Sequence, residues 1–490
     1  MQKLLNVFSA SGIALLVVIL LASGCNKPVD DGKIAITTTS SDAKESFLKG
    51  RDLFEKLRAR ESLQYFESAI TKDNKFAMAY YYHSLANPTN KGFFDDLNNA
   101  VKNSDNTSQG EKFIILALKA AADGNQKQQE TYLKKLVEIY PNDERAQWQL
   151  GQYYFGQQKF DLAVEHLKKS TEIAPDYSNS YNMLGYSYRS LGDYVNAEKA
   201  FKKYIELIPD DPNPYDSYAE MLSKQGRYEE SISQYKKALE INPGFFNSRM
   251  GISNNLILMN KQNDAVENCD NAFGLAKNDG ERRFALFTKA VAYVDEGNTM
   301  AALKAMEDEF SIAKKNNDAG AMNGDLNTMG NILFEAGKYD EAKAKFLEAV
   351  AVIENSNLAQ TIKDNNRNLG KYNIGRVALM SGYKNDALKL ANDFMIEAER
   401  MNNTFQIWLG HFFNGLIALN EKDNKKAISE FEKSNLQNPQ TYYYLAIAYL
   451  QDGNKPEAKK YAEKCANFNA LVNINQAFVR NKANDIVKSL

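Results

Sequence analysis

Small and hydrophobic residues recur at fixed offsets in the middle of the chain, with a period of 34 residues. Each period carries a small residue, an aromatic or aliphatic residue three positions later, a second small residue nine positions further on, and a closing proline. The three clearest periods carry Gly151, Tyr154, Ala163 and Pro175; Gly185, Tyr188, Ala197 and Pro209; and Ala219, Leu222, Ser231 and Pro243. This spacing fits two helices joined by a short turn, and its repetition predicts a stacked array of helix pairs.

The small residues of this pattern have a packing reason. Gly151, Gly185 and Ala219 are placed to let two helices cross at about 8–10 Å, because a larger side chain would push the helices apart. Gly192 and Gly226 fall between the two helices of a pair, where glycine adopts a positive φ at little cost. The sequence therefore predicts helix pairs that touch at small residues and turn at glycines.

The ends of each pair follow from the larger residues. We expect Phe201 and Tyr235, on the second helix of their pairs, to reach toward the next pair. The closing prolines end that second helix, because proline and the residue before it disfavour helical continuation.

The pattern weakens toward both ends of the chain but persists. Equivalent small positions are Ser253, Ala290, Gly330, Gly375, Gly415 and Ala446. Wider spacing between them predicts loops at residues 277–280 and 316–324 and one helix extending through residues 353–366. Earlier in the chain, Asn87-Pro88 interrupts a helix. About twelve helix pairs fit into the chain on this spacing.

These repeated positions strongly resemble the tetratricopeptide repeat. The resemblance implies an all-α fold, a right-handed superhelical solenoid of about twelve helix-turn-helix repeats. On this basis the chain divides into degenerate repeats over residues 43–143, a regular block over 144–277, repeats with longer helices over 278–466, and a capping segment over 467–490.

In this family the first helix of each pair lines the concave face, so groove residues follow from their offset to the crossing position. The expected groove residues are Arg145, Trp148, Gln152 and Phe155; Asn179, Asn182, Tyr186 and Arg189; and Asn213, Asp216, Glu220 and Lys224. Such a set suits an extended peptide or a partner helix, because Trp, Tyr and Arg carry much interface energy. Trp148 and Gln152 stand where chaperone-binding repeats carry Lys and Asn, which disfavours chaperone tails as partners.

A second candidate patch follows from the same offsets in two later repeats. Its residues are Asn327 and Asn331, beside Gly330, and Tyr372 and Arg376, beside Gly375. Asn amides and an Arg fork are suited to holding a peptide backbone or a carboxylate. We therefore treat these four side chains as a candidate partner-binding patch.

The first 24 residues are typical of a secretory signal. The apolar run over residues 13–22 has about ten residues, too few for the roughly 20 that span a bilayer. The following Leu-Ala-Ser-Gly-Cys, residues 21–25, resembles a bacterial lipobox. In that family the cysteine is lipidated and becomes the first residue of the mature protein, which implies a lipid anchor on Cys25. The alternative is an ordinary signal peptide with an incidental cysteine.

The segment after the signal fits an anchored protein. Residues 25–42 are polar and lack a helical period, so they are expected to form a flexible tether. Asn26 is not the aspartate that is linked to inner-membrane retention in many Gram-negative bacteria. The outer membrane is therefore favoured over the inner membrane.

Charge and candidate chemistry narrow the function. The 60 basic and 62 acidic residues give a net charge of −2, whereas nucleic-acid binding requires a clustered positive excess. His83, His166 and His411 lack the spacing of a helical metal site, and His166 is expected at the surface. Cys269 and Cys465 are expected to be buried, inert thiols. With no nucleophile elbow or phosphate loop, the sequence predicts no metal, no cofactor and no enzymatic activity.

The leading functional hypothesis is a lipid-anchored adaptor of the bacterial cell envelope that binds a protein or peptide. A glycan-binding surface lipoprotein of a polysaccharide-uptake system is the alternative. Such sites usually stack sugars on several Trp side chains, and this chain has only Trp148 and Trp408. An enzyme with a hidden site is the third hypothesis.

Overall fold

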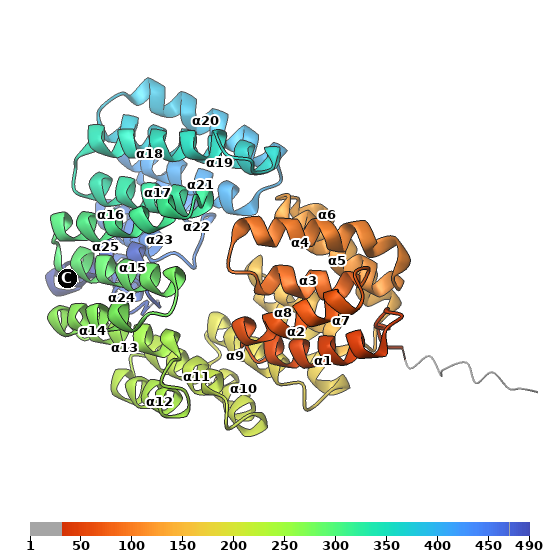
Figure 1. Ribbon diagram of the computed structural model, residues 1–490. Coiled ribbons are helices and arrows are strands. Elements are labelled where there is room, and N and C mark those ends of the chain that lie inside the picture. The colour runs from red at the N-terminus through yellow and green to blue at the C-terminus, as the bar shows by residue number, and fades with distance from the viewer. Residues whose placement is uncertain (1–31, 470) are drawn as a thin grey trace, which may run out of the picture.

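The computed structural model describes residues 32–469 and 471–490. Over these residues the protein contains 25 α-helices, one 3₁₀ turn (η1, Ser104–Asn106) and no strand. Each even-numbered helix packs against the helix before it, so α1 to α24 form twelve pairs and α25 closes the array (Figure 1). The prediction of an all-α helical repeat solenoid is confirmed. None of the helices in the described part of the chain has the length and apolar character needed to cross a bilayer.

The helix pairs follow one another along the chain. The first four are α1 (Ser41–Glu55) with α2 (Ala59–Lys72), α3 (Ala77–Ala86) with α4 (Asn90–Asn103), α5 (Gln109–Ala122) with α6 (Gln126–Ile139), and α7 (Glu144–Gly156) with α8 (Phe160–Ile173). The middle three are α9 (Ser178–Leu191) with α10 (Tyr194–Leu207), α11 (Pro212–Lys224) with α12 (Tyr228–Ile241), and α13 (Phe246–Leu258) with α14 (Gln262–Leu275). The last five, with the closing helix, are α15 (Asp279–Glu296) with α16 (Thr299–Lys315), α17 (Ala319–Glu335) with α18 (Tyr339–Glu354), α19 (Gln360–Met380) with α20 (Lys384–Arg400), α21 (Thr404–Asn420) with α22 (Asn424–Glu432), α23 (Pro439–Gln451) with α24 (Lys455–Ala466), and α25 (Ile474–Ser489).

The helices of a pair meet at the small residues that the pattern singles out. A Cβ atom added to Gly151 would lie 2.8 Å from Leu167 of α8, and one added to Gly185 would lie 2.6 Å from the Phe201 ring of α10. Both distances are shorter than van der Waals contact, so the space beside each glycine is already filled. The close crossing that the sequence predicts is therefore present in the regular block.

The same contact recurs in the later, less regular repeats. In this half of the array Gly330 faces Phe346 and Gly415 faces Phe431 of the paired helix, whereas Gly375 faces Phe413 of α21, the first helix of the next pair. Phe346, Phe413 and Phe431 are fully buried. One packing rule thus extends well beyond the residues where the sequence pattern is clearest.

Phe201 packs both within its own pair and toward the next one. Its ring fills the space left by Gly185, and it shares a hydrophobic cluster with Met221 and Leu222 of α11, as predicted. Tyr235 also reaches the next pair, where a Cβ atom added to Gly251 of α13 would overlap its ring. The two aromatic residues hold equivalent sequence positions but fill different gaps.

The predicted turns and stops are confirmed in the regular block. Gly192 and Gly226 have φ of 79° and 76° and follow α9 and α11. Helices α8, α10 and α12 each end two residues before the closing proline of their period.

The boundaries of two later elements differ from the prediction. The expected continuous helix over residues 353–366 is wrong, because α18 ends at Glu354 and α19 begins at Gln360. Between them the Ser356 hydroxyl donates to Ile353 O at 2.7 Å and accepts a hydrogen bond from the Leu358 amide at 3.3 Å, which stabilises a turn.

The loops expected at residues 277–280 and 316–324 are shorter than predicted. Helix α15 begins at Asp279, where the Asn278 side chain caps it, and α17 begins at Ala319, capped by Asp318. Asn and Asp side chains at these positions accept hydrogen bonds from backbone amides of the first helical turn. Each helix can therefore begin earlier than the sequence pattern predicts.

The N-terminal segment corrects the expected flexible tether. Residues 32–40, which we call the strap, are extended and packed on the first repeats. The Ile34 amide donates to Asp143 Oδ2 at 2.9 Å, and the Thr37 amide donates to Glu111 Oε1 at 2.9 Å. These bonds join the strap to the start of α7 and to α5, so this part of the segment belongs to the folded body. Residues 25–31 lie outside the described residues.

The array coils until distant pairs touch. Asn90, which begins α4, donates to Asp318 before α17 at 2.6 Å, and this joins the second pair to the ninth. Gly124, after α5, lies beside Asn365 of α19, which joins the third pair to the tenth. In both cases the separation is seven pairs (9 − 2 and 10 − 3). Figure 1 shows the resulting two arms, α1–α8 and α13–α25, linked through α9–α12.

We predict that Gly185→Leu destabilises the protein, because the new side chain would overlap the buried Phe201 ring. Overpacking of this kind typically costs about 1–3 kcal/mol. Thermal unfolding followed by circular dichroism measures the effect. Gly156→Leu is the matched control, because a Cβ atom at this helical glycine meets nothing within 4 Å. Equal melting temperatures for the two variants would contradict close packing at Gly185.

Candidate functional site

The first set of expected groove residues lies on α7 and is only partly accessible. Arg145 is held by Glu55 of α1, with Nε to Oε1 at 2.8 Å and Nη2 to Oε2 at 2.9 Å, and it lies over the Tyr177 ring. Trp148 and Phe155 are half-buried against the N-terminal core, whereas Gln152 is exposed. This set therefore offers a partner an exposed amide between two partly covered aromatic residues.

One charged hydrogen bond joins the second set, on α9, to the third set, on α11. Arg189 Nη1 donates to Glu220 Oε2 at 3.4 Å while lying over the Tyr186 ring, and the Tyr186 hydroxyl donates to Ser217 Oγ of α11 at 3.1 Å. Four other polar members of the two sets, Asn179, Asn182, Asn213 and Asp216, are buried. A side-chain ladder thus joins these successive first helices.

Asp216 is the most perturbed acid in this ladder. It accepts a hydrogen bond from Ser248 Oγ at 2.6 Å and is only 4% exposed. Burial, with the charge of Glu220 added, raises the pKa of Asp216 to about 8. Burial also raises the pKa of Glu220, which the Arg189 charge partly offsets. The ladder is thus sensitive to pH near neutrality.

The later candidate patch is brought together between α17 and α19. Arg376 Nη2 donates to Asn331 Oδ1 at 2.7 Å and to Asn373 Oδ1 at 3.0 Å, and Asn373 in turn donates to Asn327 Oδ1 at 3.0 Å. Arg376 also lies over the Tyr372 ring, 4.7 Å from its centroid. Arg376 is 6% exposed and Tyr372 is 5% exposed, so these two side chains present little surface to a partner.

The C-terminal segment closes onto the middle of the array, and we call its described residues, 467–469 and 471–489, the clasp. At its start the Lys224 ammonium donates to Phe468 O and lies over the Phe468 ring, 3.4 Å from the centroid. Tyr228 donates to Asn469 Oδ1 at 2.8 Å. Burial, with the charge of Arg189 added, lowers the pKa of Lys224 to about 7. Lys224, expected in the groove, is therefore covered by the chain itself.

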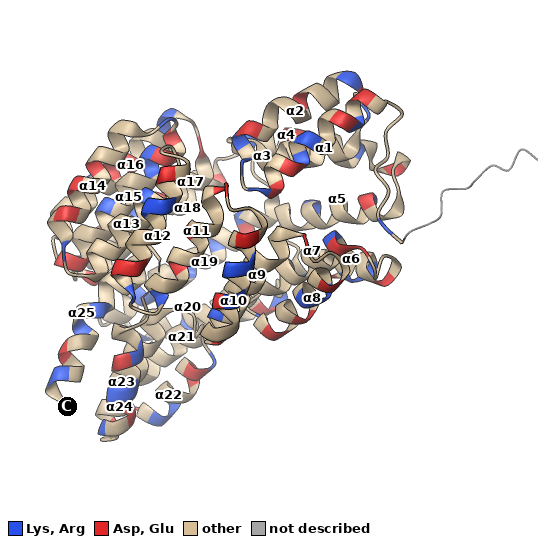
Figure 2. Cartoon of the chain, turned by 90° about the horizontal axis from the view of Figure 1, so that it is seen from below, with Lys and Arg blue, Asp and Glu red and all other residues tan. Residues whose placement is uncertain are grey.

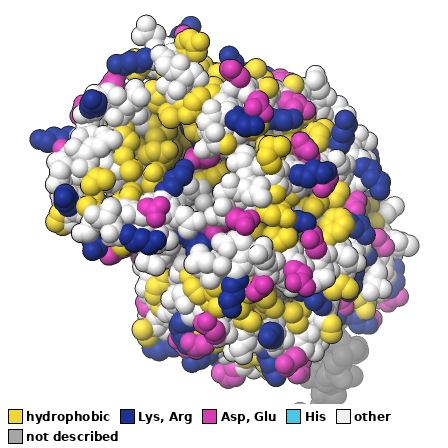
Figure 3. Space-filling model, turned by 90° about the vertical axis from the view of Figure 1, so that its left-hand side faces the viewer, with side chains coloured by type: hydrophobic (Ala, Val, Ile, Leu, Met, Phe, Trp, Pro, Cys, Tyr) yellow, Lys and Arg dark blue, Asp and Glu magenta, His cyan; other side chains and the backbone are white. Residues whose placement is uncertain are grey.

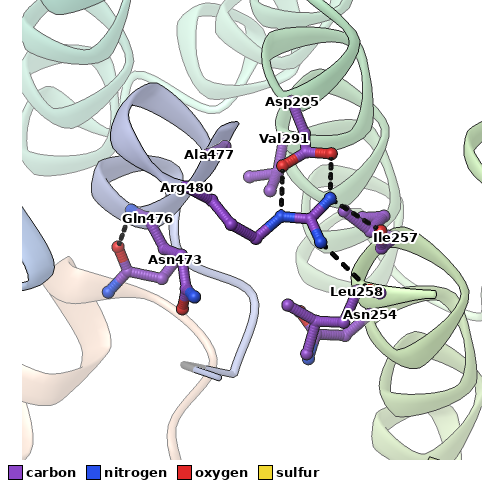
Figure 4. Close-up of a pocket in the computed structure, with 9 residues that line it drawn as sticks. All are labelled: Asn254, Ile257, Leu258, Val291, Asp295, Asn473, Gln476, Ala477 and Arg480. Atoms are coloured by element: carbon purple, nitrogen blue, oxygen red, sulfur yellow. Dashed lines mark hydrogen bonds and ion pairs between the residues drawn. The ribbon is translucent and has the colours of Figure 1, made fainter. Parts of the chain in front are cut away.

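Helix α25 continues the clasp against α24, α15 and α23, and its residues line a small pocket with the ends of α13 and α15 (Figure 4). Arg480 is 5% exposed and pairs with Asp295 at the end of α15, with Nε to Oδ1 at 2.9 Å and Nη2 to Oδ2 at 2.6 Å. The same guanidinium donates to the carbonyls of Ile257 and Leu258 at the end of α13. One arginine thus joins the ends of two helices that precede it by about 185 and 222 residues.

The sequence pattern does not reveal this contact. The C-terminal segment was expected only to cap the last repeat, and no spacing along the chain connects Arg480 with Asp295. The available signal was local, since Arg480 follows the apolar residues Phe478 and Val479, which are 7% and 1% exposed. A charge beside buried residues indicates a specific buried partner.

Titratable groups elsewhere have structural partners. His83 lies 2.8 Å from Asp96, His166 lies 2.8 Å from Gln147, and His411 lies 2.9 Å from Glu430. His166 is half-buried and stacks on a tyrosine ring, so the expectation of a surface position is only partly right. Within the described ranges, no three His, Cys, Asp or Glu side chains gather into a potential metal site.

The outer surface shows no region of one charge in the views drawn. Basic and acidic residues are interspersed along the helices seen from below (Figure 2). The face of the C-terminal arm is similarly mixed, and hydrophobic side chains gather in a hollow near one edge (Figure 3).

Comparison with known proteins locates three segments of one repeat family. Models of the tetratricopeptide repeat match residues 142–210, 213–245 and 440–468. A solved structure titled "Crystal structure of MamA protein" is 21% identical, with a TM-score of 0.28, and the match covers 33% of this chain and 87% of that one. A search of curated proteins finds no match.

We predict that Asp216 makes stability fall as pH rises. The pKa of Asp216 in the folded protein, about 8, lies above its ordinary value of 3.8, so between these values the folded protein binds more protons than the unfolded chain. Raising the pH from 5 to 8 should therefore lower the unfolding free energy of the wild type, relative to Asp216→Asn, by at least about 1 kcal/mol. Urea unfolding at both pH values measures this difference. Asp210→Asn, at an exposed carboxylate nearby, is the control, and parallel pH profiles for all three proteins would contradict the prediction.

Proposed function

We propose that this protein, a solenoid of tetratricopeptide repeats, is a non-enzymatic scaffold that binds another protein or a peptide on its concave face. The observation that carries the proposal is the repeated helix pair, because stacked pairs form extended concave surfaces suited to partner binding. Helix α7 supplies a contact region there, with Gln152 exposed and Trp148 and Phe155 half-buried. Partly covered aromatic residues beside a polar group are typical of interface anchors.

The state of the nucleophilic and basic side chains supports a non-enzymatic role. Burial raises the pKa of the Cys269 thiol to about 11 and also raises that of Cys465, which disfavours the reactive thiolate. The three histidines lie on different helices, and each contacts a structural partner. General acid–base catalysis instead needs such groups to converge on one substrate position.

A protein partner is favoured over a glycan. Trp148, on α7, is half-buried against the N-terminal core, which leaves little of its indole free to stack on a sugar. Trp408 is partly buried and packs edge-on against Phe405, with centroids 5.2 Å apart.

We further propose that the protein is lipid-anchored in a bacterial envelope through Cys25, more favourably at the outer membrane. Cys25 lies outside the described residues, and the proposal rests on the lipobox-like sequence before it. The strap adds a geometric consequence. Because the strap is hydrogen-bonded to α5 and to Asp143 before α7, the chain from Cys25 to Gly32 spans at most about 25 Å. An anchor at Cys25 would therefore hold the first repeats close to the membrane.

We predict that Cys25→Ser releases the protein from membranes when it is expressed in a Gram-negative bacterium, because serine has no thiol to receive a diacylglyceryl group. Immunoblots of membrane and soluble fractions, with intact-mass measurement of the purified protein, test this. Cys269→Ser is the control, since this buried thiol lies far along the chain and should not affect anchoring. An unchanged distribution of Cys25→Ser, without lipid mass on the wild type, would remove the anchor from the proposal.

We also predict that a photo-crosslinking amino acid at Gln152 captures one discrete partner in native membranes, identified by mass spectrometry. The same probe at Glu165, exposed on α8 of the same pair, should not capture that partner. Matching adducts from both positions, or none from either, would contradict binding on the concave face.

A further inference from the structure

Helix α25 occupies the groove in the manner of a bound ligand. Its Arg480 guanidinium contacts five acceptor atoms, which are both carboxylate oxygens of Asp295, the carbonyls of Ile257 and Leu258, and Asn260 Oδ1. Asn481 adds a bond to the main-chain oxygen of Asp295 at 2.8 Å. All of these contacts come from side chains of α25 and reach helices that belong to the seventh and eighth pairs.

The groove atoms that surround Arg480 define the chemistry of what they bind. All five are acceptors, and the carbonyls lie at the C-terminal end of α13, where the helix dipole places negative charge. A guanidinium, with its fixed fork of five N–H donors and no acceptor, matches such a set. A lysine ammonium has three donors on one atom and cannot reach both carboxylate oxygens and two carbonyls in the same way.

The apolar contacts add a second requirement. Phe478, Val479 and Ala483 belong to a cluster formed with α15, α16, α17, α18 and α24, among residues such as Ala290, Leu326 and Cys465. These three positions are two and one before and three after the arginine, which places them on one side of a helix. The groove therefore selects a helix with this apolar pattern around an arginine.

The ion pair between Arg480 and Asp295 is specific, and an arginine on another helix could form it as well. Burying an ion pair costs much of its Coulomb energy in desolvation, so such a pair fixes register and partner choice more than it adds stability. The outward face of α25 is exposed at Asn481, Lys482 and Asp485. A helix from another molecule with the same pattern would form the same contacts, but it competes with an occupant that is covalently linked to the groove, so it binds when α25 is loosened or when its own contacts are stronger.

We propose that the groove between α13, α15, α23 and α24 is the recognition site for an amphipathic helix of a partner protein that presents an arginine, and that α25 fills it when the partner is absent. This inference rests on the proposed scaffold function and names its partner chemistry. A second copy of the chain is a less suitable donor of that helix, because Lys224 and Tyr228 hold the segment just before α25.

The test uses the full chain and a fluorescent peptide of residues 473–490. We expect the peptide to bind Arg480→Ala protein at least about tenfold more tightly than the wild type, because the variant weakens the internal occupant and keeps every acceptor of the groove. Fluorescence anisotropy measures the binding. A peptide in which the arginine is replaced by lysine should bind at least about tenfold more weakly to the same variant.

Asp295→Asn is the decisive control, because it also weakens α25 but removes the charged acceptor from the groove. It should not gain peptide binding. If Arg480→Ala fails to fold, Asn481→Ala loosens α25 by another bond and should give the same gain over the wild type.

Equal binding to wild type and variants, or a gain by Asp295→Asn, would overturn the inference. So would a dimer in sedimentation that exchanges α25 without binding the peptide. Peptide binding without any partner captured at Gln152 would fault the scaffold proposal instead.

Discussion

The close crossing of paired helices at small residues is the constraint on which the rest of the structure depends. At Gly185 the space of a missing side chain is filled by the Phe201 ring, and the same exchange recurs at Gly330 with Phe346. Such packing leaves the two helices one relative position, because interiors at this density tolerate neither a void nor an extra methylene. Repeating one fixed pair geometry along a chain produces a regular coil.

The tightness of that coil explains the character of the concave face. Arg145 finds its carboxylate partner on α1, 90 residues away, and Asn90 reaches Asp318 in the opposite arm. Polar side chains that would face solvent in an open solenoid here bond to neighbouring helices. The surface that a partner can contact is therefore limited to side chains that the coil leaves exposed and to the groove that α25 fills.

Features formed by residues close together in the sequence could be predicted. Contacts that depend on the coiling of the array could not. The positions of the helix pairs, the turns at Gly192 and Gly226 and the crossing glycines follow from spacing, because each involves residues within one pair. The contact between Arg480 and Asp295 joins residues 185 positions apart, and no local pattern encodes the curvature that brings them together. The strap was missed although a signal was present, since Ile34 and Ile36 alternate within a polar segment as in an extended chain packed on one side.

Close packing of a crossing glycine against an aromatic ring extends into the long stretch between the matched segments 213–245 and 440–468. A double-mutant cycle of Gly330→Ala and Phe346→Leu tests it most directly, with unfolding free energies measured in urea. The smaller leucine should make room for the added methyl group. The double variant should therefore lose less unfolding free energy than the sum of the two single losses, by about 1 kcal/mol or more. Strictly additive effects would show that the two side chains do not share one packed space, and would contradict the account.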